Sequence, residues 1–309
     1  MGIKIRWTDI NQVAPVNFKI YRSQSEINIA APGVALATVG SGIREYDDTT
    51  AVRNTRYYYR VSCLNALGEE FFSDHIIAGY YPDTGPGNNS LRRGNYEFGY
   101  FDKIAISDFL TPAEIYAMCG SPAGTLHASA THWFKVAYKG KVLFFPNSSI
   151  VHTCAFNTLW NLGLVYGDLP QEQWNPNAFG GSTGRALVAQ NKIITRQTKD
   201  YRVRLPSARP DNQRQLTDAA ANAVGGDIDK LLLPFLSGTY PTFGFQSNPK
   251  MADDVVAGSG NTTAILQADF SGTSLITRTL VTANVQTATP ATVAPTAASQ
   301  WLPILELVL

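Results

Sequence analysis

The feature that most constrains the fold is an alternation of apolar and polar residues along the N-terminal part of the chain. Ile3, Ile5 and Trp7 alternate with Lys4 and Arg6, and a period of two is typical of a strand with one buried face. The same period recurs downstream, at Phe18 and Ile20 and at Tyr57, Tyr59, Val61 and Cys63. Short strands at even spacing, with turn residues between them, predict an all-β sandwich over residues 1–82.

The composition changes after this region. Residues 83–96, DTGPGNNSLRRGNY, are rich in Gly, Asn and Ser and contain a proline, which is typical of a linker. We therefore expect two separate folding units that are joined by this segment.

Residues 97–309 predict an irregular α+β domain. Thr111 as N-cap, Pro112 at N1, Glu114 at N3 and a terminating Gly120 predict a helix over 111–120. Further elements are predicted as hairpins at 133–145 and 192–208 (the second turning at 198–200), short helices at 155–163 and 225–236, a closing strand at 301–309, and a long exposed loop near 282–300.

Composition narrows the classes of function. The chain has 309 residues, of which 16% are charged, and a formal net charge of +1, so no overall charge attracts it to nucleic acid or to an anionic membrane. No run reaches the roughly 18 apolar residues of a membrane helix, and the N-terminus lacks the apolar region of a signal peptide. Cys63, Cys119 and Cys154 are odd in number and far apart, so we expect buried thiols and a protein that folds in a cytoplasm.

Residues 131–167 contain most of the side chains that could carry chemistry. An activated lysine needs desolvation or a neighbouring cation, and the pattern around Lys135, Lys139 and Lys141 demands neither. Lys139 and Lys141 flank a hairpin glycine, where lysines are usually solvated. This stretch therefore predicts no catalytic lysine.

The other reactive side chains predict no site either. His132, His152 and Cys154 do not follow the ligand spacings of zinc sites, although a three-ligand site assembled in space stays open. GGSTG at 180–184 matches neither a nucleophile elbow nor a phosphate loop. The sequence thus predicts no catalytic residue, no metal site and no cofactor.

The first 80 residues resemble a fibronectin type III domain. The resemblance rests on Trp7 on an early strand, on YRS ending a middle strand, and on YDDTT followed by NTRYYYRVSCLNALGEE. It implies that Tyr57 is the tyrosine-corner residue, whose hydroxyl bonds back to the backbone. That family normally has a further strand before the tryptophan strand, which this chain starts too late to supply. We therefore expect Ile3, Ile5 and Trp7 to lie on an exposed edge that serves as an assembly edge.

Residues 98–309 resemble a domain that recurs in virion structural proteins of tailed bacteriophages. The motifs occur in the order FGYFDKIAISDFLTPAEI, WFKVAYKGKVLFFP, LWNLGLVYG, YRVRLPSA, GGDIDKLLLPFL and WLPILELVL. The resemblance implies that Lys141 and Arg204 pair with surface or inter-domain carboxylates. It also implies packing anchors at Trp133, Tyr138, Trp160, Tyr166 and Trp301, in addition to Tyr57 in the first domain.

The terminal segment is similar to the closing strand of C-type-lectin-like and sulfatase-modifying-factor-like folds, except that Leu302 stands where many relatives carry Arg. The fold expected for 97–309 is therefore α+β of a C-type-lectin-like kind.

Together these resemblances imply a non-enzymatic structural component of a bacteriophage virion, in the head decoration, collar or neck, tail or baseplate. Its partners would be copies of itself and other virion proteins, and its location would be the virion. The alternative is a receptor- or glycan-binding module of a phage fibre or spike, with host surface glycan contacted by Trp174 and by residues 239–245. A hydrolase would need an acid pair in a cleft, and the sequence offers none.

Overall fold

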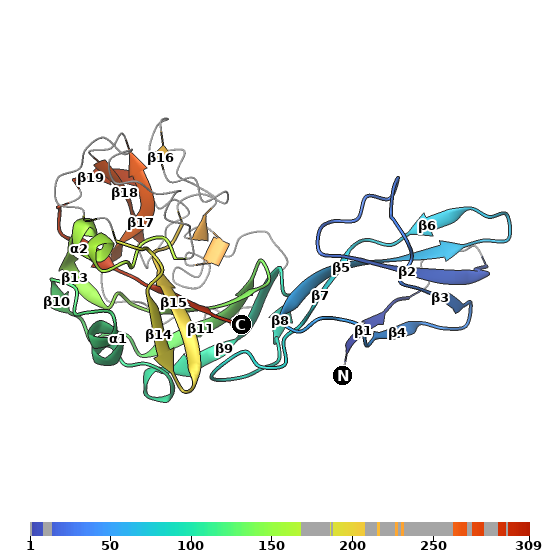
Figure 1. Cartoon of the computed structure of the whole chain (residues 1–309), viewed down its shortest axis with the longest axis horizontal. Helices are drawn as coiled ribbons and strands as arrows, with labels where there is room; N and C mark the ends of the chain where they lie inside the picture. The colour runs from blue at the N-terminus through green and yellow to red at the C-terminus, as the bar shows by residue number, and fades with distance from the viewer. Residues whose placement is uncertain are drawn as a thin grey trace.

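The structure is a computed structural model that describes residues 2–8, 14–167, 186, 188–207, 215–216, 226–227, 230–231, 262–270, 274–280, 290–294 and 296–309. The protein is mostly β-sheet, with 41% of its residues in strands and 9% in helices. Figure 1 shows the N-terminal strands on the right and the remaining strands and helices on the left, joined at a narrow waist. Among the described helices, none is long and apolar enough to cross a membrane.

The N-terminal strands form two sheets that pack face to face. The smaller sheet pairs β1 (Ile3–Arg6) with β4 (Glu45–Asp48), antiparallel. The larger sheet has the order β3-β2-β5-β6, and β7 also pairs with β5. Its strands are β2 (Asn17–Ser23), β3 (Ala37–Gly40), β5 (Thr55–Leu64), β6 (Glu70–Phe72) and β7 (Ile76–Tyr80).

The alternating residues of these strands meet in one core. Ile3 and Ile5 of β1 face the larger sheet, and the core is completed by Phe18, Ile20, Tyr57, Tyr59, Val61 and Cys63. Lys4 and Arg6 are exposed on the opposite face of β1. The period-two pattern is thereby confirmed for these strands, because one face of each is buried and the other is not.

The rest of the chain forms two further sheets. One has the order β14-β15-β21-β12-β11-β9-β8 and the other β10-β13-β20-β17-β18-β19, with β16 paired to β17. The strands of the first are β8 (Arg93–Gly94), β9 (Phe98–Ala105), β11 (His132–Tyr138), β12 (Lys141–Pro146), β14 (Ile193–Arg196), β15 (Lys199–Arg204) and β21 (Ile304–Leu307). Those of the second are β10 (Thr125–Leu126), β13 (Val151–Cys154), β16 (Gln215–Leu216), β17 (Thr262–Phe270), β18 (Ser274–Leu280), β19 (Pro290–Val293) and β20 (Ser299–Trp301).

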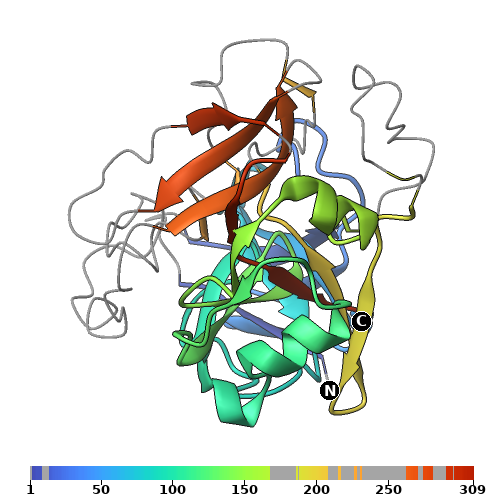
Figure 2. The same cartoon turned by 90° about the vertical axis from the view of Figure 1, so that its left-hand side faces the viewer.

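Two short α-helices accompany these sheets in the described part, and Figure 2 shows both on the side that faces the viewer. They are α1 (Pro112–Met118) and α2 (Phe156–Asn161), and a 3-10 turn, η1 (Ile106–Asp108), precedes α1. The predicted α1 is confirmed, including its capping box: the Glu114 N–H donates to Thr111 Oγ1 and the Thr111 N–H donates to the Glu114 carboxylate.

Three details differ from the sequence-based expectations. The second hairpin turns at Gln197–Thr198, both at positive φ, rather than at 198–200, because a two-residue turn of this kind matches strand twist. The expected closing strand is two strands, β20 and β21, which belong to different sheets. The expected loop near 282–300 contains strands β19 and β20. GGSTG, Trp174, residues 239–245 and most of the helix expected at 225–236 lie outside the described residues.

The segment 83–96 joins the two parts but is not a solvated tether. Thr84 is fully buried, and Leu91 and Tyr96 pack against the second core. A Cβ atom on Gly87 would lie 2.8 Å from the Ile104 side chain, so the backbone of this segment is in close contact with the second core. The domain boundary itself stays a prediction.

Candidate functional site

The candidate assembly edge is the side of β1 that faces away from β4. β1 pairs with β4 and with no other strand in the part of the chain that is described. The Trp7 N–H donates to the Arg44 carbonyl, at 3.2 Å. The backbone N–H and C=O groups of successive residues in an antiparallel strand point to opposite sides, so residues two apart point to the same side. Because the Trp7 N–H faces β4, the backbone groups of Ile5 and Ile3 face β4 too. The N–H and C=O groups of Lys4 and Arg6 therefore face the open side.

The side chains of this strand are divided between the core and a charged outer face. Ile3 and Ile5 are buried. Lys4 Nζ and Arg6 Nε each contact one oxygen of Glu45, at 3.2 Å. The hydrogen bonds from Lys4 and then from Arg6 hold the pKa of the exposed Glu45 carboxyl below its usual value. Two cations share one carboxylate here, so an incoming strand would meet positive charge along β1.

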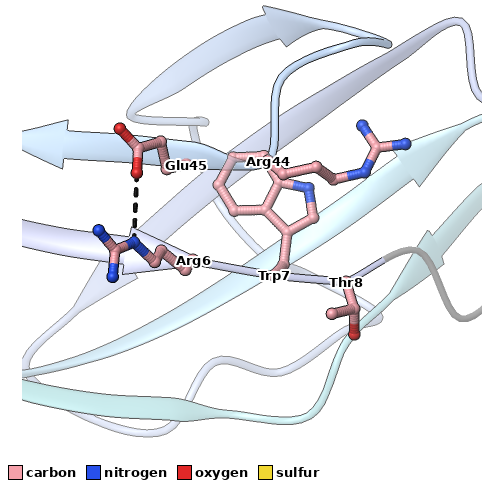
Figure 3. Close-up of a pocket in the computed structure, with 5 residues that line it drawn as sticks. All are labelled: Arg6, Trp7, Thr8, Arg44 and Glu45. Carbon is pink, nitrogen blue, oxygen red and sulfur yellow. Dashed lines mark hydrogen bonds and ion pairs between the residues drawn. The ribbon is translucent and has the colours of Figure 1, made fainter.

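Trp7 continues the edge into an open pocket of about 550 Å³, lined by Arg6, Trp7, Thr8, Arg44 and Glu45. Figure 3 shows the Trp7 indole between the Arg6–Glu45 ion pair and the Arg44 side chain. The indole also packs at 5.6 Å from the Phe18 ring, and the Arg44 guanidinium lies 4.6 Å from that same ring. The pocket thus combines an aromatic side chain with two cations and one acid.

The aromatic residues expected as anchors mostly lie in the cores. Trp133, Trp160, Tyr166 and Trp301 belong to the second core and Tyr57 to the first, whereas Tyr138 is half-buried. Two of the indoles also donate to backbone carbonyls: Trp133 to Leu110 and Trp160 to Ala186.

The two cations expected to pair with surface or inter-domain carboxylates pair instead with buried ones. Lys141 Nζ lies 2.8 Å from Glu306 Oε1, and Arg204 Nη1 lies 2.5 Å from Asp227 Oδ2. Glu306 is buried and also contacts Arg202, at 3.0 Å. Lys141, Arg202 and Glu306 lie on β12, β15 and β21, so their ion pairs hold neighbouring strands of one sheet together, whereas Asp227 lies outside these strands.

Sequence reasoning missed one residue, Lys135. Its side chain is fully buried on β11. The ammonium group is therefore desolvated, although the sequence pattern gave no sign of this. Burial lowers the pKa of Lys135 to about 7, against the attraction of Asp83 and Asp102. The neighbouring exposed lysine, Lys139, is solvated as expected.

The Lys135 ammonium occupies a cage of three carbonyl oxygens. Its Nζ donates to the carbonyls of Pro86 and Asn88, both at 2.8 Å, and of Gly85, at 3.3 Å. The rings of Phe101 and Phe144 lie 5.0 and 5.8 Å from the nitrogen. The only sign of this cage in the sequence is the Gly-Pro-Gly of the linker, which indicates a tight turn. Nothing in the local sequence connects that turn to a lysine about fifty positions downstream.

His132, His152 and Cys154 do not come together as ligands. No group of three or more His, Cys, Asp or Glu that could hold a metal ion occurs among the residues placed by the structure. His152 instead stacks on His127, with ring centroids 3.8 Å apart, and its Nε2 lies 2.9 Å from Ser149 Oγ. All three cysteines are buried and none is in a disulfide, and burial raises the pKa of the Cys119 and Cys154 thiols to about 12. Thiols held in this state are poor nucleophiles at neutral pH.

Comparison of the chain with family models, with characterised proteins and with solved structures finds no match. A function for the protein therefore has to be argued from its residues and their geometry.

Proposed function

We propose that the protein is a non-enzymatic structural component of a tailed-bacteriophage virion that assembles through protein–protein contacts. Its N-terminal part is a fibronectin type III-like sandwich, and residues 97–309 form a C-type-lectin-like virion domain. Copies of the chain and neighbouring virion proteins are the partners, and the virion is the location.

The N-terminal geometry supports the fibronectin type III-like part of the proposal. Two antiparallel sheets pack around Ile5, Phe18 and Tyr59, as in a β-sandwich. The Val52 N–H donates to Tyr57 Oη at 3.1 Å, which is a hydrogen bond of the tyrosine-corner kind from a residue a few positions upstream.

The closing segment supports the C-type-lectin-like part of the proposal. Trp301 ends β20 in one sheet, and Ile304 begins β21 in the other, between β15 and β12. The C-terminal residues therefore hold the two sheets together. Leu302, which replaces the arginine of many relatives, is buried, so this position contributes to the core rather than to a charged surface.

The observation that carries the assembly role is the open side of β1. Four backbone groups, the N–H and C=O of Lys4 and of Arg6, face it, while Ile3 and Ile5 anchor the strand in the core behind it. An added strand would gain roughly 0.5–1.5 kcal/mol for each hydrogen bond formed. Strand addition at a sheet edge is a recognised mode of assembly.

The location is tested by labelling particles. An antibody against the full chain should decorate tailed particles purified from the lysate in which the gene is expressed. Particles that are free of the chain would contradict the proposal.

The edge is tested by Lys4→Pro. Proline at this position removes an N–H that faces away from β4, so the β1–β4 ladder keeps its hydrogen bonds. We expect the variant to fold but to be lost from particles when it is supplied to a phage whose own copy is deleted. Lys4→Ala controls for the ion pair with Glu45, which is exposed and contributes little. Normal incorporation of a folded Lys4→Pro protein would exclude this edge.

A second candidate function is receptor or glycan recognition by a phage fibre or spike, and the pocket around Trp7 favours it. An indole packs on the apolar face of a sugar ring, and guanidinium and carboxylate groups hydrogen-bond to hydroxyls. The full chain should then bind on a glycan array and lose that binding in Trp7→Ala. Phe71→Ala, at an exposed aromatic on β6, is the matched control. Absence of binding by the wild-type chain would exclude this function.

A further inference from the structure

The burial of Lys135 is costly and needs a reason. Moving an ammonium group out of water carries a large desolvation penalty, and the rings of Phe101 and Phe144 beside Lys135 would pack equally well against a methionine. A methionine, however, could not donate to the three carbonyl groups of the turn, which would lose this partner. The reason for a lysine at this position is therefore its set of hydrogen bonds to the turn.

The ammonium group of Lys135 fixes the position of the turn Gly85–Asn88, which an apolar side chain would not do. Its three N–H groups match three carbonyl oxygens of one turn, Gly85–Asn88. Each hydrogen bond is directional, so the three together hold this turn in a single position on the sheet. A methionine would fill the same space but would let the turn slide.

The turn is shaped for this close approach. Gly85 and Gly87 have φ values of +79° and +77°, and a Cβ on Gly85 would lie 3.0 Å from Tyr201 Oη. The Gly85 N–H donates to Asp83 Oδ1, and Thr84 Oγ1 donates to Asn89 Oδ1. Local hydrogen bonds and glycines thus present the carbonyl groups to β11.

Neither carboxylate near Lys135 replaces the carbonyls as its partner. Asp83 pairs with Lys199, and Asp102 pairs with Arg92 at 2.6 Å. The positive charge of Lys135 is therefore held by the backbone of the turn.

The turn follows directly on the last strand of the N-terminal sandwich. Tyr81, one residue beyond β7, stacks on Tyr96 with ring centroids 4.3 Å apart, and its hydroxyl donates to the Gly140 carbonyl in the β11–β12 hairpin turn. Arg56 of β5 pairs with Glu97. These few contacts are the seam between the two parts, and the position of the turn decides whether they can form.

We propose that Lys135 and the turn Gly85–Asn88 form a latch that fixes the orientation of the N-terminal sandwich relative to the second core. The latch gives the protein one rigid shape. In an assembled particle such a device would hold the assembly edge of β1 at a constant direction.

The test is a distance distribution between spin labels in the two parts of the full chain. The native cysteines are buried, so labels are placed at Thr38→Cys on β3 and Ala113→Cys on α1, both exposed. The measurement is made at about pH 6, where a lysine with a pKa near 7 is protonated. We expect a narrow distribution in this background, and a broad one when Lys135→Met is added, at a temperature below the melting transition of both proteins.

Lys103→Met, at an exposed lysine on neighbouring β9, is the matched control and should keep the narrow distribution. A folded Lys135→Met protein with the control's distribution width would overturn the latch, whatever its melting temperature. If Lys135→Met fails to fold, Gly87→Ala decides. Its Cβ would contact Ile104 and lift the turn while leaving the ammonium in place, so a broad distribution supports the latch and an unchanged one overturns it.

Discussion

At the scale of single residues, Asp48 is a buried acid of the N-terminal sandwich with several hydrogen-bond donors around it. It is fully buried at the end of β4. Tyr59 Oη and Arg22 Nη1 each donate to its Oδ2 at 2.7 Å, and the Thr50 N–H and hydroxyl donate to its Oδ1. Burial raises the pKa of the carboxyl, but these hydrogen bonds outweigh burial and hold the pKa below its usual value. One carboxylate thus connects the two sheets.

We expect Asp48→Asn to lower the free energy of unfolding by about 3–5 kcal/mol, because it leaves the Arg22 charge without its partner. The measurement is denaturant unfolding at neutral pH. Asp47→Asn, at the exposed neighbouring position, should change stability little. Equal effects of the two substitutions would mean that the buried network is not the cause.

His152 predicts a pH dependence. Burial, and then the neighbouring His127, lower the pKa of His152 below its usual value. The unfolded chain therefore binds more protons than the folded one as the pH falls below about 6.5, and the free energy of unfolding declines down to the pKa of the folded protein. His152→Gln should remove part of this decline in unfolding curves recorded across the interval. The same slope in both proteins would rule out His152 as its source.

At the scale of elements, the hydroxyl of Tyr57 fixes the connection between β4 and β5. It accepts the Val52 N–H across a loop of the first core. Val52 is exposed, so water can replace the lost partner. We expect Tyr57→Phe to cost about 1 kcal/mol of unfolding free energy, measured by denaturant titration. Tyr46→Phe removes a hydroxyl from a half-buried position on β4 and is the control. A Tyr57→Phe protein as stable as the wild type would show that the loop does not need this hydrogen bond.

At the scale of the whole molecule, two clusters of described core residues lie on opposite sides of a small seam. The first cluster is built around Ile5 and Tyr59, the second around Trp133 and Trp301. We expect two calorimetric transitions, because few contacts couple the cores. Asp48→Asn should lower only the transition of the first core. A single transition, or equal shifts of both, would show one cooperative unit and contradict the boundary expected at 83–96.

The sequence determined those elements whose signals are local. The alternation of Ile3, Ile5 and Trp7 with Lys4 and Arg6 predicted the two faces of β1, and Thr111 with Glu114 predicted the start of α1. Such signals can be read because a strand has a period of two and a helix cap spans one turn. The all-β class of the N-terminal part follows from signals of this kind. The α+β class predicted for residues 97–309 understates the strands, because the described residues there form two sheets with two short helices.

Only the tertiary structure decided the environment of Lys135. The residue occurs in a predicted hairpin close to two exposed lysines, Lys139 and Lys141, and nothing within a few positions distinguishes it. It is buried because a turn about fifty residues earlier folds onto its sheet and supplies three carbonyl oxygens. Likewise, the terminal segment reads as one strand, but Trp301 and Ile304 pair with different sheets. Burial and pairing of this kind depend on which distant segments meet, and the local sequence does not encode that.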